Sequence, residues 1–125
     1  MTLIFGGAYQ GKLAYAKQVF GSEAKISRCS EDEETLDFSG TIITGYHLLV
    51  LAQLRNGIDP CAYLEAHWDD LREKVILSDD ISCGVVPIDA EMRQWREALG
   101  RCLGMLSRKA DSVIRVFCGI GMKLK

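Results

Sequence analysis

The chain has 125 residues and a formal net charge of -2 at pH 7. This length favours a single domain over residues 1–125 with one hydrophobic core, and 48% hydrophobic with 26% charged residues is typical of a globular protein. The charge excludes a general attraction to nucleic acid or anionic membranes, so the binding of anions needs a local basic site.

The apolar runs are far shorter than the roughly 20 residues of a membrane-spanning helix, and the start of the chain does not resemble a secretory signal. We therefore expect a cytoplasmic protein without a membrane partner. The five cysteines are widely spaced, with no Cys-x-x-Cys pair. We interpret them as free, mostly packed thiols and predict no metal site.

The first predicted elements are a strand, a glycine turn and a helix. Thr2–Phe5 is a short apolar run closed by glycine, and Lys12–Phe20 has apolar residues at helical spacing before the stop at Gly21. A second short strand is expected at Ala24–Ser27. The acidic stretch Cys29–Ser39 is expected to be a solvated connection.

The middle of the chain continues the alternation of strand and helix. The β-branched run Thr41–Thr44 predicts a buried strand, and Gly45 then turns the chain into a helix over Tyr46–Leu54. Pro60 suits the first turn of a helix that we expect to run to about Glu73. His67 lies on the apolar side of that helix, and we interpret it as a packing residue.

The last third contains a strand at Lys74–Ser78 and the longest helix, at about Asp89–Ala110, joined by a loop through Gly84 and Pro87. Asp89 suits the N-cap position of this helix. Two further strands are expected, at Ser112–Cys118 and at Met122–Lys125, with a turn over Gly119–Gly121 between them. Strands that alternate with helices favour parallel pairing through right-handed crossovers, so the predicted class is α/β.

The first turn carries the strongest functional signal. Its sequence matches G-x-x-x-x-G-K between a strand and a helix, where glycines let backbone N–H groups surround phosphate oxygens and the lysine reaches the outer phosphates. The alternative is a glycine-rich turn with an exposed lysine. The predicted nucleotide-binding residues are Gly6, Gly7, Ala8, Tyr9, Gln10, Gly11, Lys12 and Leu13.

Two positions depart from what magnesium-dependent chemistry needs. Leu13 stands where a Ser or Thr hydroxyl would coordinate the ion that bridges the terminal phosphates. The strand ending at Thr44 has no acid at its end. Asp79 and Asp80 follow another buried strand and are the candidate catalytic residues, because ligands bind at the carboxyl ends of parallel strands. The alternative is a pair of solvated loop acids.

Two blocks of sequence resemble the adenosylcobinamide kinase and adenosylcobinamide-phosphate guanylyltransferase family of cobalamin biosynthesis. Leu3–Lys12 is similar to the family's apolar strand followed by G-G-A-R-S-G-K-S. Val75–Pro87 resembles its V-L-V-S-N-E-V-G-x-G-I-V-P, and Arg93–Arg101 resembles its R-x-F-R-D-x-x-G-R. The resemblance implies a P-loop NTPase-like, three-layer α/β/α fold with a mostly parallel sheet, GTP or ATP as ligand with Mg²⁺, and a homo-oligomer.

The resemblance weakens where the chemistry is expected. The family carries a histidine that receives the guanylyl group in a helical insert, whereas Cys29–Ser39 contains no histidine. His47 follows the Thr41–Thr44 strand and is the histidine that can face the site, although it does not match the family position. Asp80 keeps a carboxylate where the family has Glu.

Three hypotheses follow. The chain is a shortened, divergent family member with a degenerate phosphate loop that binds a purine nucleotide with reduced or no catalysis. Alternatively, it is an active adenosylcobinamide kinase. The third hypothesis is a ligand-free structural or assembly paralogue.

Overall fold

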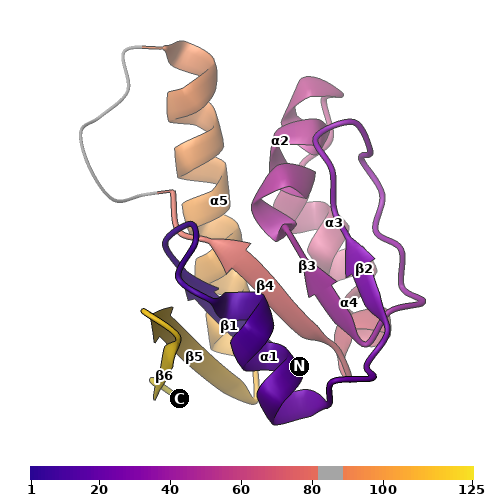
Figure 1. Ribbon diagram of the computed structural model, residues 1–125. Helices are drawn as coiled ribbons and strands as arrows, with labels where there is room; N and C mark the ends of the chain where they lie inside the picture. The colour runs from indigo at the N-terminus through magenta and orange to yellow at the C-terminus, as the bar shows by residue number, and fades with distance from the viewer. Residues whose placement is uncertain (82–88) are drawn as a thin grey trace.

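The strands form one six-stranded sheet in the computed structural model, which describes residues 1–81 and 89–125 (Figure 1). The order across the sheet is β2-β3-β4-β1-β5-β6; the first five strands are parallel, and β6 runs antiparallel to β5. The strands are β1 (Thr2–Gly6), β2 (Ile26–Arg28), β3 (Ile42–Thr44), β4 (Val75–Asp79), β5 (Ser112–Phe117) and β6 (Ile120–Lys123).

Helices cover both faces of the sheet (Figure 1). Helix α1 lies on one face, and the other helices lie on the opposite face. The helices of the described ranges are α1 (Lys12–Phe20), α2 (Tyr46–Arg55), α3 (Pro60–Ala66), α4 (Trp68–Leu71) and α5 (Ala90–Lys109). The predicted three-layer α/β/α fold with a mostly parallel sheet is therefore confirmed.

Alternate residues of each central strand enter different halves of the core. In β1, Leu3 packs with the helices α2 to α5, whereas Ile4 packs beneath α1 with Ala16. Both β1 side chains are fully buried. Burying a side chain of this size contributes about 1.5–3 kcal/mol, so the strands that position the site are held from both faces.

The first and longest helices agree with their predictions. Helix α1 has the predicted bounds Lys12–Phe20. Helix α5 begins as expected after Asp89, whose carboxylate accepts a hydrogen bond from the Glu91 N–H at 2.8 Å. The predicted loop through Gly84 and Pro87 lies outside the described residues.

The predicted single helix Pro60–Glu73 is wrong. The chain leaves helical geometry at His67 (φ -109°, ψ 15°), which separates α3 from α4. The His67 ring packs against Tyr63 and against Phe38 from the connection before β3, with centroid distances of 4.4 and 5.3 Å. We attribute the break to this packing, which a helical periodicity cannot reveal.

Two short strands are shifted from their predicted positions. The second strand ends at Arg28 instead of Ser27. The last strand begins at Ile120 instead of Met122, because the turn is made by Cys118 and Gly119, with φ values of 51° and 76°. Gly121, predicted in the turn, is a strand residue.

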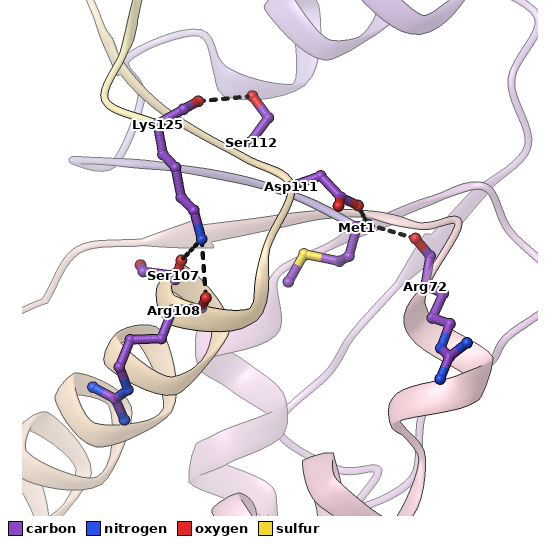
Figure 2. Close-up of polar contacts among 7 residues, drawn as sticks. All are labelled: Met1, Arg72, Ser107, Arg108, Asp111, Ser112 and Lys125. Atoms are coloured by element: carbon purple, nitrogen blue, oxygen red, sulfur yellow. Dashed lines mark hydrogen bonds and ion pairs between the residues drawn. The ribbon is translucent and has the colours of Figure 1, made fainter.

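Polar contacts fasten Met1 and Lys125, the first and last residues of the structure, to their surroundings (Figure 2). The amino group of Met1 lies 2.7 Å from the Asp111 carboxylate and also donates to the Arg72 carbonyl. Lys125 donates to the carbonyls of Ser107 at 3.2 Å and Arg108 at 2.9 Å, where the last turn of α5 leaves carbonyl groups without helical partners. These contacts hold the start of β1 and the end of α5 in place.

No helix in the described part of the chain is both long and apolar enough to cross a membrane. Within the described residues, four cysteines are free thiols, as predicted: Cys29, Cys61, Cys102 and Cys118. The predicted free thiol of Cys83 lies outside those residues. Burial raises the pKa of Cys29 and of Cys102 to about 12 in each case. These two thiols are therefore protonated at neutral pH.

Candidate functional site

The glycine loop begins where the end of β1 passes close to its neighbour in the sheet, β5. A Cβ atom on Gly6 would lie 2.3 Å from the carbonyl oxygen of Val116, so only glycine fits there without a backbone shift. Gly11 is the N-cap of α1 and has a φ of +86°, in the left-handed region that favours glycine. Gly11 has no side chain that could cap α1, so the first N–H groups of the helix remain available to a ligand.

A turn from the other end of the chain supports the loop. The Cys118 N–H donates to the Gln10 side-chain oxygen at 2.7 Å, and the Gly119 N–H donates to the Gln10 carbonyl at 2.8 Å. A Cβ on Gly11 would approach the Gly119 Cα to 3.3 Å. The β5–β6 turn thus fixes the conformation of the loop.

Lys12 is mostly buried at the carboxyl edge of the sheet. Its ammonium lies 2.6 Å from the Asp79 carboxylate and donates to the Gly7 carbonyl at 2.8 Å. The side chains of Lys12 and Asp79 are only 10% and 25% exposed. The pairing of β1 with β4, which places Gly6 beside Asp79, brings these groups together.

His47 approaches the same carboxylate from the start of α2. Its Nδ1 accepts a hydrogen bond from the Asp79 backbone N–H at 3.2 Å, and its Nε2 lies 3.5 Å from the Asp79 carboxylate. The His47 carbonyl accepts from the Trp95 indole at 2.7 Å. Burial lowers the pKa of His47, with a further contribution from Lys12, and Asp79 opposes the shift. The neutral ring is thus favoured.

An open cavity of about 470 Å³ lies over these groups. It extends from the loop along the carboxyl edge of the sheet and reaches the ends of β4, β3 and β2. It is lined by Ala8, Tyr9, Gln10, Gly11, Lys12, Leu13, Ala14, Arg28, Thr44 and Asp79.

The structure separates the two candidate carboxylates. Asp79 lines the cavity, whereas Asp80 lines another one, of about 200 Å³, beside Leu3 and Phe5 on the face covered by α5. The Asp80 backbone N–H donates to the Gly6 carbonyl at 2.8 Å. Of the predicted site residues, Ala8 to Leu13 and Asp79 line the cavity together, and the others support it or lie apart.

Arg28 and Thr44 are cavity residues that were not predicted from the sequence as part of the site. Arg28 ends β2, and Thr44 beside it ends β3. The available signal was the rule that ligands bind at the carboxyl ends of parallel strands. The predicted second strand stopped at Ser27, one residue too early to include Arg28.

The residues around the cavity do not fit a magnesium ion held by the protein. Mg²⁺ prefers oxygen ligands in octahedral geometry, but the side chain of Leu13 has no oxygen and packs against the apolar cluster beneath α1. Asp79 supplies a carboxylate that is already paired with Lys12. Within residues 1–81 and 89–125 there is no group of three or more His, Cys, Asp or Glu side chains that could hold a metal ion.

Comparison with known families agrees with this architecture. A family model described as cobinamide kinase / cobinamide phosphate guanyltransferase matches residues 36–124, well over half of the chain. The chain belongs to this family. No curated protein gave a significant match.

The matched segment begins after the glycine loop and includes the ends of β3 and β4, with Thr44 and Asp79. The relation to cobinamide kinase / cobinamide phosphate guanyltransferase therefore rests on the strands β3 to β6 and on the helices α2 to α5. Leu3–Lys12, which precedes the matched segment, resembles the family's glycine-loop block. Membership in this family supports a place in cobalamin biosynthesis.

Proposed function

We propose that residues 1–125 form a single domain that binds a purine nucleotide, GTP or ATP, at the glycine loop, with reduced or no catalysis. The observation that carries this proposal is the Lys12 ammonium, held at the wall of a cavity beside the first turn of α1. Leu13, in the position of the metal-binding hydroxyl, is the reason to expect weak chemistry.

The electrostatics of the loop support anion binding. The amino-terminal end of α1 offers unpaired N–H groups and a partial positive charge, and Lys12 adds a full charge next to them. Asp79 offsets part of this charge because it lies 2.6 Å from the ammonium. A phosphate group must therefore share Lys12 with Asp79 or displace it.

Calorimetric titration with GTP and ATP, with and without magnesium, tests the proposal. Lys12→Ala is expected to lower affinity by about tenfold or more, since hydrogen bonds to charged groups contribute about 1.5–3 kcal/mol. Lys17→Ala, in the last turn of α1 and outside the cavity, is the matched control. Absence of binding at millimolar nucleotide would favour the ligand-free structural paralogue.

An active adenosylcobinamide kinase is the second candidate, supported by Asp79. This carboxylate reaches the cavity from the end of β4, where a group that positions phosphate or hydroxyl is expected. The test is turnover of GTP or ATP with adenosylcobinamide as acceptor. Turnover that Asp79→Asn abolishes would establish the kinase, whereas nucleotide binding without turnover would support the first proposal.

We also propose that the chain forms a homo-oligomer. Support comes from the β5–β6 hairpin, where Phe117, Ile120 and Met122 are 63%, 73% and 60% exposed. Large apolar side chains gathered on one surface are typical of interaction sites. Light scattering should find an oligomer that dissociates in Ile120→Lys. The control Tyr9→Lys, which changes another exposed side chain, should leave the oligomer intact. A monomer at high protein concentration would refute the proposed homo-oligomer.

A further inference from the structure

Arg28 places a second cation in the cavity of the glycine loop. It ends the edge strand β2, where it pairs with Thr44 of β3, and both residues line the cavity that Lys12 lines from the other end. In the described part of the chain, no carboxylate lies within ion-pair distance of Arg28. Its guanidinium is thus available to a ligand.

The strand order separates the two cations. From β1 to β2 the sheet advances by three strand spacings, which is about 14 Å between strand backbones. The long side chains of Lys12 and Arg28 line one cavity across this span, and Asp79 and Thr44, from the strands between, line it as well. A single phosphate group in the glycine loop would leave Arg28 unused.

The charges indicate which ligand can use both ends. Lys12 and Asp79 offset each other, so Arg28 gives the cavity a net positive charge without any metal ion. A guanidinium matches phosphate oxygens through two parallel hydrogen bonds and keeps its charge at any physiological pH. Leu13 and Thr44 also line the cavity, and neither supplies a carboxylate that would hold a magnesium ion there.

We propose that Arg28 is the second phosphate-binding group of this site. The ligand then carries at least two linked phosphate groups, one in the glycine loop and one directed toward β2. Arg28 supplies the charge neutralisation that a protein-held magnesium ion would otherwise give. This inference rests on the proposed binding of nucleotide phosphates at the loop and specifies the ligand class and the metal dependence.

The test is calorimetric titration in EDTA with orthophosphate, pyrophosphate and tripolyphosphate. The unmodified protein is expected to bind tripolyphosphate about tenfold more tightly than orthophosphate, and Arg28→Ala should remove about tenfold of affinity for tripolyphosphate only. Arg28→Lys should restore part of that loss. Arg72→Ala, a change of an exposed arginine outside the cavity, is the matched control and should change neither affinity.

The outcomes separate this inference from the function on which it rests. If Lys12→Ala abolishes the binding of tripolyphosphate and Arg28→Ala leaves it unchanged, phosphate binding stands and the role of Arg28 is overturned. The role of Arg28 is likewise overturned if tripolyphosphate binds only when magnesium is present. If none of the three anions binds to the unmodified protein, the proposed function fails and this inference fails with it.

Because Arg28 is exposed, Arg28→Ala is expected to keep the thermal midpoint of unfolding of the unmodified protein. Loss of tripolyphosphate affinity at an unchanged midpoint would support a direct contact. An equal loss for orthophosphate and tripolyphosphate would instead overturn the assignment of Arg28 to a second phosphate group.

Discussion

Removing the ion pair between Lys12 and Asp79 one partner at a time should destabilise the protein more than removing both partners together. The variants are Lys12→Met, which keeps most of the apolar stem, Asp79→Asn, and the double variant. Each single change leaves a mostly buried group without its partner, whereas the double change leaves two neutral side chains.

The expected coupling follows from the geometry. At 2.6 Å and an effective dielectric constant of about 20, the attraction is about 6 kcal/mol. Desolvation offsets much of this, because the side chains of Lys12 and Asp79 retain only 10% and 25% of their exposure. We therefore expect a coupling free energy of about 2 kcal/mol.

Urea denaturation of the four proteins, followed by circular dichroism, measures this coupling. The same cycle at high salt should give a similar value, because a mostly buried pair is screened less than a surface pair. A coupling below about 0.5 kcal/mol, which exposed pairs commonly show, would refute the close contact at the base of the candidate site.

Three further predictions concern stability. Gly6→Ala should lower stability by about 1–3 kcal/mol because its Cβ would meet the Val116 carbonyl at 2.3 Å. The control Gly7→Ala, whose Cβ would have its nearest neighbour at 3.6 Å, should change stability by less than about 0.5 kcal/mol. Urea denaturation measures both, and equal effects would contradict the close approach of β1 to β5. Burial lowers the pKa of His47 below its ordinary value of 6.5, so the unfolded chain takes up a proton there at a pH where the folded protein does not. The contribution of His47 to stability should be fully present above pH 6.5 and should fall as the pH drops toward the pKa of the folded state. The midpoint of thermal unfolding, measured between pH 7.5 and 5.5, should therefore decline less in His47→Gln than in the unmodified protein. An equal decline in both proteins would count against the buried neutral ring. Lys125→Ala should lower stability by about 0.5–1 kcal/mol because two carbonyls at the end of α5 lose a charged donor, and the control Lys123→Ala should lower it less. The thermal midpoint of unfolding measures both effects. Equal losses would argue against a stabilising role of the Lys125 hydrogen bonds.

Local signals predicted the elements that local chemistry decides. The helix Lys12–Phe20 has a glycine at each end, and Asp89 supplies a side-chain cap, so periodicity and end signals sufficed for both. The break at His67 depends on Phe38, which precedes it by a long stretch of chain. The periodicity of a helical segment cannot predict a contact with a residue so distant in the sequence.

The sequence predicted the loop residues of the candidate site but not the side of the cavity formed by the ends of β2 and β3. The glycine pattern indicated the residues from Ala8 to Leu13, but the partner of Lys12 depends on β4 lying next to β1. That order is a property of the folded sheet. Arg28 was missed for the same reason, because an arginine at the edge of a short strand is ordinary until the strand order places it over the cavity.

The hydrogen bonds from Cys118 and Gly119 to Gln10 join positions 108 residues apart in the first case. During synthesis the glycine loop emerges long before the turn that shapes it. Closing a contact of such high sequence separation costs loop-closure entropy, which slows its formation. The conformation of the glycine loop therefore depends on the β5–β6 turn, and the proposed phosphate site would form only once that turn has left the ribosome.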